Sequence, residues 1–446
     1  MSTRVDAVIV GAGPAGSACA MHLARRGIRP LIVEKEEHPR FHIGESLTGE
    51  AGKLLRELGL ADQLAAAPHP VKHGVNVYGP AGQESWHVPV MGRDDAGELF
   101  EQTTWQVRRS RFDAGLLNAA RELGADTLVG EAVEPLRTDD GAVGGVVVRR
   151  PDGGEVRVEA EVTLDCSGSG TFLAHAGVTG PKYMGNYDNQ IAIFTHVTGA
   201  RLWDDPDQFV RTGNTLIFYQ KKFHWAWVIP IEPDVVSVGV VIPADYFRAR
   251  GETREVFLAR ELRELNPGLA ERMEEATMIE PVRAIVNYSF QVQGFCGPGF
   301  ICIGDAHRFV DPIFSFGVNV ALKEAEMAAA AVERYLAGEG RDQANPFRDH
   351  LLAAEHAIDI LEDTIDLFWE QPLGFAYYVH RKFRDQLIDT FAGRIYYGKT
   401  NLALEKFRTA LGRERRYDDD TLISMPIGSR FQPERAAIWE RSQPVP

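Results

Sequence analysis

A glycine-rich turn between a short apolar strand and a helix constrains this chain most strongly. Residues 5–10, VDAVIV, have the continuous apolar character of a strand buried on both faces of a parallel sheet. They lead into GAGPAG, in which Gly11, Gly13 and Gly16 have GxGxxG spacing, and then into the helical periodicity of SACAMHLARRG. A second apolar run, PLIVEK, carries Glu34 near its end. This order of strand, glycine turn, helix, strand and acid predicts a βαβ unit that binds a dinucleotide.

Each part of this unit has a physical task at a dinucleotide. The first glycine permits a tight turn, the second lets a pyrophosphate approach the backbone, and the third lets helix and strand pack closely. Amide groups at the start of the helix, where Ala15 lies, would face the anion. Glu34 would accept hydrogen bonds from ribose hydroxyls, and we count the adjacent Lys35 among the cofactor-binding residues. The alternative is a glycine-rich turn without a ligand.

A second strand–acid–helix unit lies far downstream, at residues 300–331. An apolar strand leads into Gly304-Asp305, and a long amphipathic helix begins near Gly317. Two such units suit a cofactor too extended for one βαβ unit, which favours FAD over NAD. Asp305 would accept a hydrogen bond from a polyol hydroxyl, and the helix start at Gly317 and Val318 would present N–H groups to an isoalloxazine edge. The alternative for Asp305 is a turn or helix cap.

The intervening segments have other patterns. Residues 128–164 predict a β-meander with DDG and PDGG turns, and residues 180–290 alternate apolar and polar positions as in a mixed or antiparallel sheet. A strongly helical tail follows Pro346. The predicted fold class is α/β (α+β), with a Rossmann-like parallel sheet, the meander, a second sheet for substrate and a helical C-terminal tail. The predicted domains are FAD-binding (1–75, 105–178 and 285–340), substrate sheet (76–104 and 179–284) and C-terminal helical region (341–446).

Composition excludes several classes of function. A formal net charge of -15 argues against nucleic-acid binding, which needs a basic face. No apolar run reaches the roughly 18 residues of a membrane helix, and a strand begins too early for a signal peptide. The four cysteines lack metal-ligand spacing, so we expect no metal site and a cytoplasmic, reduced protein. The basic run RERR at 413–416 is either a solvated surface segment or a docking site for an acidic carrier protein.

Three further segments resemble flavin-dependent halogenases, which have the flavoprotein monooxygenase fold. WAWVIP at 225–230 matches the WxWxIP signature of that family, and DPIFSFGV at 311–318 is close to its DPxFSSGV loop. Lys72 follows the GES segment of FHIGESLTGE at the family's spacing. VRRSRFD at 107–113 is similar to the segment whose arginine contacts the flavin, here Arg109, and VTLDCSGSG is similar to the third strand of the cofactor domain. The tail segment IYYGKTNLALEKF is similar to the shorter phenol and pyrrole halogenases.

The resemblance implies a two-component enzyme of natural-product biosynthesis that receives FADH2 from a separate flavin reductase. With O2, a flavin C4a-hydroperoxide would oxidise chloride or bromide to hypohalous acid. Lys72 would receive that acid and halogenate an electron-rich phenol or pyrrole, free or bound to an acyl or peptidyl carrier protein. Glu45 would couple the flavin site to the lysine.

Two features of these segments need interpretation. Trp225, Trp227 and Pro230 would separate substrate from flavin, although two indoles on one strand face are also ordinary core residues, and the proline predicts the end of that strand. We group Pro312, Ser315, Phe316 and Gly317 as a halide and flavin loop. Phe316 stands where the family has serine, which leaves a non-halogenating hydroxylase or oxidase on the same fold as the alternative. A non-enzymatic flavin-binding scaffold is the third possibility.

Overall fold

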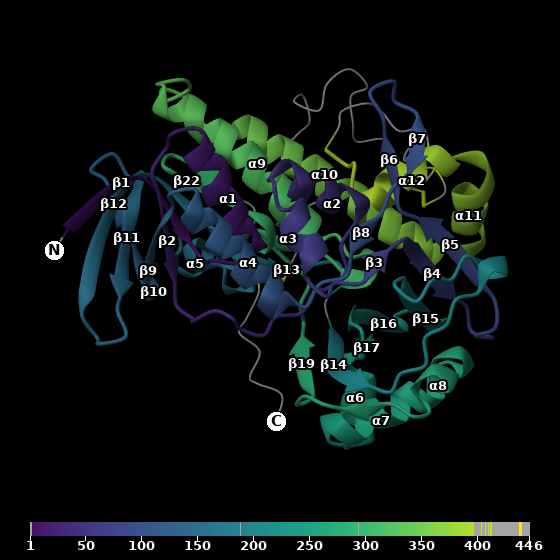
Figure 1. The fold of residues 1–446 in the computed structure, drawn as a ribbon. Coiled ribbons are helices and arrows are strands. Elements are labelled where there is room, and N and C mark those ends of the chain that lie inside the picture. Colours follow the sequence, from purple (N-terminus) through teal and green to yellow (C-terminus); the bar gives the residue numbers. More distant parts are fainter. Residues whose placement is uncertain are drawn as a thin grey trace.

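The computed structural model of this 446-residue chain describes residues 2–187, 189–292 and 294–396, with a few positions beyond them. Those positions are 403, 406, 409, 411, 412, 437 and 438. The basic run at 413–416 lies outside the described residues, and so does most of the segment IYYGKTNLALEKF. Two large sheets with their helices make up most of the molecule (Figure 1).

The first sheet has the predicted βαβ unit at its centre. Its parallel strands have the order β9–β2–β1–β12–β22. Their bounds are β1 Ser2–Val10, β2 Pro30–Glu34, β9 Asp126–Val129, β12 Glu155–Asp165 and β22 Phe300–Cys302. The helices associated with this sheet are α1 Pro14–Arg25, α4 Arg109–Glu122 and α9 Gly317–Leu336. Ala7 and Ile9 of β1 join the apolar cluster formed with these helices.

The predicted meander extends the first sheet. β10 (Glu131–Arg137) and β11 (Val143–Arg149) pair antiparallel with each other, and β11 pairs antiparallel with β12. Val8 and Val10 of β1 pack with valines of β11 and β12 in a separate buried cluster. β1 is therefore covered on both faces, which explains the continuous apolar run at residues 5–10.

The second sheet has the order β18–β14–β17–β16–β15–β4–β5, with β19 paired to β14. The bounds are β4 Gly74–Tyr78, β5 Ser85–Pro89, β14 Gln190–Thr198, β15 Thr215–Lys221, β16 His224–Glu232, β17 Val235–Pro243, β18 Thr277–Met278 and β19 Arg283–Val286. β15 and β4 are parallel and the other pairs are antiparallel, so this is the predicted mixed sheet. The helices α6 Ala244–Arg250, α7 Arg254–Glu264 and α8 Pro267–Met273 lie along its lower side (Figure 1).

β16 is buried on both faces, and its residues alternate between two clusters. Trp225, Trp227 and Ile229 pack in the cluster that contains the buried side of the C-terminal helices. Ala226 and Val228 pack instead in the cluster that contains apolar residues of α7 and α8. This alternation places both indoles on the inner face of the sheet, as their two-residue spacing predicted.

The predicted end of this strand at Pro230 is wrong. β16 continues to Glu232, and Pro230 pairs with Val236 of β17. On the other side, β15 pairs with β16 only as far as Val228, so no ladder on that side needs an amide from Pro230. The ladder with β17 is irregular between Pro230 and Glu232, which is typical of a proline within a sheet.

The predicted helical tail is confirmed over its described part. Its elements are α10 Arg348–Glu370, α11 Pro372–Tyr377, a π-helical turn Tyr378–Lys382 and α12 Arg384–Ala392. α10 runs beside α9, whereas α11 and α12 lie at the right-hand edge beside β4–β7 (Figure 1). No helix within the described part of the chain combines the length and apolar character required to cross a bilayer.

The remaining elements are short. They are α2 Gly49–Glu57, α3 Ala61–Ala66, α5 Phe172–His175, β3 Val71–Lys72, β6 Met91–Arg93, β7 Leu99–Glu101, β8 Thr104–Trp105, β13 Lys182–Met184, β20 Phe290–Val292, β21 Cys296–Gly297 and β23 Arg308–Phe309. Among them, β21 pairs with β22 at the first sheet. The boundaries of the three predicted domains stay a prediction.

Candidate active site

In the turn between β1 and α1, two of the three glycines have no room for a side chain, whereas the third has open space beside it. A Cβ on Gly11 would lie 2.5 Å from the carbonyl oxygen of Cys166, and the φ of Gly11 is +103°. A Cβ on Gly16 would lie 1.9 Å from the carbonyl oxygen of Gly11. A Cβ on Gly13 would meet nothing closer than the Arg40 guanidinium, at 3.6 Å. The backbone at Gly13 is therefore the place where a pyrophosphate could approach, with Ala15 in the first turn of α1 beside it.

This difference gives a direct test of cofactor binding. We expect Gly13→Ala to fold normally and to weaken FAD binding roughly 10- to 100-fold, about 1.4–2.8 kcal/mol, because its methyl group would occupy the space of the phosphates. Titration of the apoprotein with FAD, followed by flavin fluorescence, measures the change. Gly374→Ala in α11 is the matched control, because its Cβ would meet nothing closer than the side chain of Gln371, at 3.8 Å. Equal affinity in the two variants would contradict the assignment.

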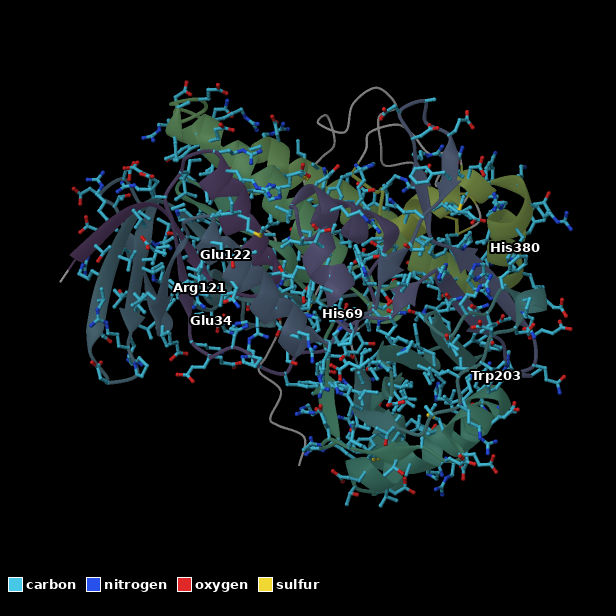
Figure 2. The ribbon with its side chains drawn as sticks, viewed as in Figure 1. Glu34, His69, Arg121, Glu122, Trp203 and His380 are labelled. Carbon is cyan, nitrogen blue, oxygen red and sulfur yellow. The ribbon has the colours of Figure 1, made fainter. Side chains whose placement is uncertain are left out.

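Glu34 lies at the end of β2 and faces the glycine turn (labelled in Figure 2). Its carboxylate accepts hydrogen bonds from the amides of Ala12 at 2.6 Å and Glu36 at 2.9 Å. Burial alone would raise the pKa of Glu34, but His38, whose Nε2 lies 4.0 Å away, and the hydrogen bonds from these amides outweigh burial and lower it to about 2. Glu34 is thus an ionised acceptor at neutral pH. Lys35, the next residue, is exposed.

A buried carboxylate in α9 holds the predicted Gly304-Asp305 turn. Glu324 accepts from the amide of Gly304 at 2.7 Å and pairs with Nε2 of His307 at 2.9 Å. Asp305 itself accepts no hydrogen bond from the residues that the structure describes, so the alternative of a capping role is not supported. Burial raises the pKa of Asp305 to about 6, and the positive charge of Arg109 opposes this rise. The side chain of Asp305 is partly exposed but closely surrounded by protein atoms, as expected for an acceptor in a concave ligand site.

Arg109 connects the cofactor side of the molecule to residues 41–44. Its guanidinium forms a two-point pair with Asp113, at 2.7 and 3.0 Å, and donates to the carbonyl oxygens of Ile43 and Gly44 at 2.6 and 3.2 Å. The charge of Arg109, together with burial, lowers the pKa of the neighbouring His42 to about 4. Arg109 is buried, so it fixes the path of this segment as well as facing Asp305.

The segment predicted to hold the halide, residues 311–318, is called the halide loop below and is a short turn that leads into α9. Asp311 accepts from the amide of Ile313 at 2.9 Å, and Ser315 has a left-handed backbone with φ of 61°. The ring of Phe316 is buried and lies edge-on to Phe314, with ring centres 6.3 Å apart. A Cβ at Gly317 would meet no atom within 4 Å. The bulk of Phe316 is therefore accommodated in the apolar cluster, while the start of α9, where Gly317 and the buried Val318 lie, has open space beside it.

Lys72 is buried and has only neutral partners among the described residues. Its Nζ donates to Ser46 Oγ at 2.8 Å and to the carbonyl oxygen of Leu47 at 2.9 Å, and the side chain as a whole is buried, with Lys72 2% exposed. Ser46 Oγ in turn lies 2.8 Å from Thr215 Oγ1, to which Gln106 donates at 2.8 Å. Burial without a counter-charge lowers the pKa of Lys72 to about 7. Ammonium and free amine are thus both populated near neutral pH.

Glu45, the residue before Ser46, is the first of a series of buried and half-buried charged residues, each in contact with the next. Its Oε1 lies 2.8 Å from His196 Nε2, and His196 Nδ1 lies 3.1 Å from Glu280 Oε1. Arg108 donates to Glu280 at 2.7 Å and to Glu232 at 2.8 Å. Burial would lower the pKa of His196, but the two carboxylates outweigh burial and raise it. His196 on β14 therefore holds Glu45 in place. Because Glu45 precedes Ser46, this contact also fixes the backbone at Ser46, whose hydroxyl accepts from Lys72.

The raised pKa of His196 has a consequence for stability that can be measured. His196 contributes stability that is fully present below its unfolded pKa of about 6.5 and is lost as pH rises through its higher folded pKa. We expect His196→Gln to lower the free energy of unfolding by about 1–3 kcal/mol at pH 6 and by less at pH 9. Urea unfolding across this range provides the measurement. His175→Gln, at the end of α5, is the control, and an equal loss at both pH values would contradict a charged His196.

The two indoles lie on the sheet face that Lys72 also approaches. The ring centres of Trp225 and Trp227 are 5.9 Å apart, and Trp227 donates to Ser237 Oγ at 3.1 Å. Trp227 is paired with Ile217 of β15, and Thr215 lies two residues earlier on that strand, hence on the same face. Through Ser46 and Thr215, Lys72 and the tryptophan pair belong to one side of the second sheet. Pro230 lies further along β16, where its contact is with β17.

Sequence reasoning missed several residues of this site. Ser46, Thr215, Gln106 and His196 contact Lys72 or Glu45 directly or through one or two hydroxyls, yet none was predicted. Ser46 carries a sequence signal, because it belongs to the GES segment that precedes Lys72. The others come from β14, β15 and the residue after β8, and only strand pairing brings them together.

The fold and the site define a class of FAD-binding enzymes. The family model "FAD binding domain" matches residues 4–345. A 1H-pyrrole-2-carbonyl-[peptidyl-carrier protein] brominase of Pseudoalteromonas luteoviolacea is 36% identical over 87% of this chain and 91% of its own length. The corresponding chlorinase of Pseudomonas fluorescens is 28% identical over 90% of this chain and 92% of its own length. The solved structure of flavin-dependent brominase Bmp2 has a TM-score of 0.84 and 36% identity, covering 92% of this chain and 98% of that one.

The chain belongs to the FAD-binding domain family and, within it, to the flavin-dependent halogenases. It is an FAD-dependent halogenase that uses a halide, which confirms the predicted family, fold class, enzyme class and cofactor. These comparisons also favour the halogenase over the hydroxylase and scaffold alternatives, although Phe316 replaces the family's serine.

Proposed function

We propose that this enzyme halogenates a pyrrole-2-carbonyl group carried by a peptidyl-carrier protein. The two relatives described above have this substrate in their names. The observation that carries the proposal is the placement of Lys72, a buried amine without a carboxylate partner among the described residues, on the side of the second sheet that also holds Trp225 and Trp227. A pyrrole is electron-rich, as electrophilic halogenation requires.

The residues present fit FAD. The open backbone at Gly13, the ionised Glu34 and the unpaired carboxylate of Asp305 would hold its pyrophosphate, ribose and ribityl chain, and Arg109 and the start of α9 would lie at the flavin. Bound reduced FAD with O2 supplies the oxidising power that converts chloride or bromide to hypohalous acid. Amide groups beside Gly317 would hold the halide.

Lys72 would receive the hypohalous acid and orient it toward the ring. Its ammonium form can donate to the oxygen of that acid, and its amine form can accept the halogen; a pKa of about 7 allows both. The ring carbon gains the halogen and loses its proton. The hydroxide released from the hypohalous acid takes up a proton and leaves as water.

Neighbouring residues would keep the two reactions apart. Trp225 and Trp227 are rigid and buried, and would exclude the organic substrate from the flavin while a small acid passes. Pro230 is an odd number of residues away from both indoles, so it lies on the opposite face of β16 and is not part of this barrier. Glu45, held by His196, would fix the backbone next to Ser46 and thereby the position of Nζ. Because the sequence has no second complete GxGxxG unit, a separate flavin reductase would supply the reduced cofactor.

One assay tests this function. The enzyme is supplied with FADH2 from a reductase, with O2, with chloride or bromide, and with the pyrrolyl-loaded carrier protein of the Pseudoalteromonas brominase. We expect halogen isotope patterns in the mass spectrum of the pyrrolyl group and none without halide. Free pyrrole-2-carboxylate and a set of phenols are the competing substrates. Hydroxylated product without halogen would overturn the proposal, and halogenation of a free phenol alone would overturn the tethered substrate.

A further inference from the structure

The C-terminal helices present an exposed basic and apolar surface on an otherwise acidic protein. This C-terminal surface consists of Leu373 and Tyr377 on α11, with Arg381, Lys382 and Arg384 after it. Leu373 is 87% exposed and Tyr377 55% exposed. Residues 372–384 contain no aspartate or glutamate, whereas the whole chain has a formal net charge of -15. Such a local reversal of sign favours an acidic partner.

The charges on this surface are largely uncompensated within the described residues. Arg381 and Lys382 form no ion pair there, and Arg384 has Asp385 at 3.6 Å as its partner. Partial burial of the His380 ring and the charges of Arg381 and Arg384 lower the pKa of His380, so the positive charge comes from the lysine and the arginines. An exposed leucine and tyrosine lie beside two cations that form no ion pair within the described part of the chain. This combination matches a partner with an apolar contact bordered by carboxylates.

Beneath this surface, ring contacts lead continuously to the halide loop. The ring centre of His380 lies 6.0 Å from that of Trp86, which lies 5.7 Å from Phe375. Phe375 is stacked with Phe314 at 6.2 Å, and Phe314 contacts Phe316. Figure 2 labels His380 at the edge of the molecule, below α11 and beside the β4–β5 hairpin. The surface is therefore the outer end of the aromatic cluster whose inner end is the halide loop.

We propose that the surface formed by Leu373, Tyr377, Arg381, Lys382 and Arg384 is the docking site for an acidic carrier protein that delivers the tethered ring. This inference rests on the proposed function and deepens it by naming where the partner binds. Docking here would place the attachment point of the arm over the aromatic cluster, which also contains Trp225 and Trp227. The exposed cations would steer the encounter and the leucine and tyrosine would contribute the apolar contact.

The test compares one variant on two substrates. Arg381→Glu/Lys382→Glu is assayed with the pyrrolyl-loaded carrier protein of the Pseudoalteromonas brominase and with the pyrrolyl thioester of pantetheine, which lacks the protein. We expect KM for the carrier to rise about tenfold or more and to lose most of its dependence on salt, with kcat little changed. Turnover of the pantetheine thioester should stay within about twofold of the unmodified enzyme, because only the carrier contacts this surface.

Arg121→Glu/Arg137→Glu, at exposed positions on α4 and β10, makes the same change in formal charge elsewhere and is the matched control. Thermal unfolding of both variants checks the fold, and Leu373→Ser tests the apolar contact without altering charge. An unchanged KM for the carrier, or equal losses on both substrates, would overturn the docking site. So would light scattering that shows a dimer which only the surface variant dissociates, because the occupant would then be a second copy. Failure of the unmodified enzyme on both pyrrolyl substrates would instead refute the proposed function.

Discussion

Replacement of Lys72 by methionine is expected to reduce halogenation at least about a thousandfold, roughly 4 kcal/mol in activation free energy, while reduced flavin is still oxidised. Methionine fills a similar volume but cannot donate to or accept from hypohalous acid. The oxidant would still form at the flavin, because Lys72 contacts Ser46 and Leu47 and not the cofactor-binding residues. Product formation by mass spectrometry, together with oxygen consumption and peroxide release, measures both halves of the reaction.

Two variants make this experiment specific. Lys53→Met, on the half-exposed side of α2, removes a nearby lysine that lies beside Glu50 and Glu57 and should leave halogenation unchanged. Lys72→Arg keeps a positive charge but brings a planar group that does not lose its proton, so it should not restore activity. Halogenation by Lys72→Met at the rate of the unmodified enzyme would show that another residue receives the oxidant.

The same methionine variant should be more stable than the unmodified protein. The pKa of Lys72 is about 7 in the folded chain and near 10.5 when unfolded, so the unfolded chain binds an extra proton between these values. The unmodified protein therefore loses stability as pH falls from about 10.5 to about 7 and levels off below that. The variant lacks this loss. Denaturant unfolding should show a stability difference that grows by about 2–4 kcal/mol over this window.

Replacement of Trp227 by alanine is expected to cost about 3–5 kcal/mol of stability and to uncouple flavin oxidation from halogenation. Trp227 is buried, packs against Trp225 and Phe194, and donates to Ser237, so truncation leaves both a void and an unpaired hydroxyl. If the indoles separate flavin from substrate, the void opens a route by which hypohalous acid escapes. The measurement is halogenated product per flavin oxidised, alongside trapping of free hypohalous acid by an added thioether.

The control for that variant is Trp203→Ala. Trp203 is half-buried, packs against the guanidinium of Arg272 at 4.0 Å, and lies low on the right of Figure 2, near α8. It should also lower stability but leave coupling intact. Trp227→Phe should regain most of both properties, since a ring still fills the space. If the Trp227→Ala enzyme stays fully coupled, Trp225 and Trp227 are ordinary core residues and do not separate flavin from substrate.

The features that could be predicted are those determined by residues close together in the sequence. The glycine turn, Glu34 and the Gly304-Asp305 turn are each specified within a few residues, because strand, turn and helix signals adjoin them. The shared face of Trp225 and Trp227 follows from the two-residue period of a strand. These features are present in the structure as expected.

The rest depends on which strands pair, and no short stretch of sequence determines that. The prediction that Pro230 ends its strand fails because a local rule does not reveal that β15 pairs with β16 only as far as Val228. The proline is tolerated there for that reason. Likewise, the burial of Lys72 and its contact with Ser46, and the clamp of His196 on Glu45, join residues separated by 26 and 151 positions along the chain. Nor does the loop sequence reveal that the ring of Phe316 is buried edge-on to Phe314.

The contact of Phe314 with the tail helices limits how such enzymes can be recombined. Phe314 belongs to the halide loop, yet its ring meets Phe368 of α10, Phe375 of α11 and Phe391 of α12. A chimaera joined in the turn between α9 and α10, with another enzyme's tail, would break these contacts unless the aromatic partners were transplanted with it. When tails are exchanged to obtain new selectivity, this loop and the three helices should therefore be transferred together.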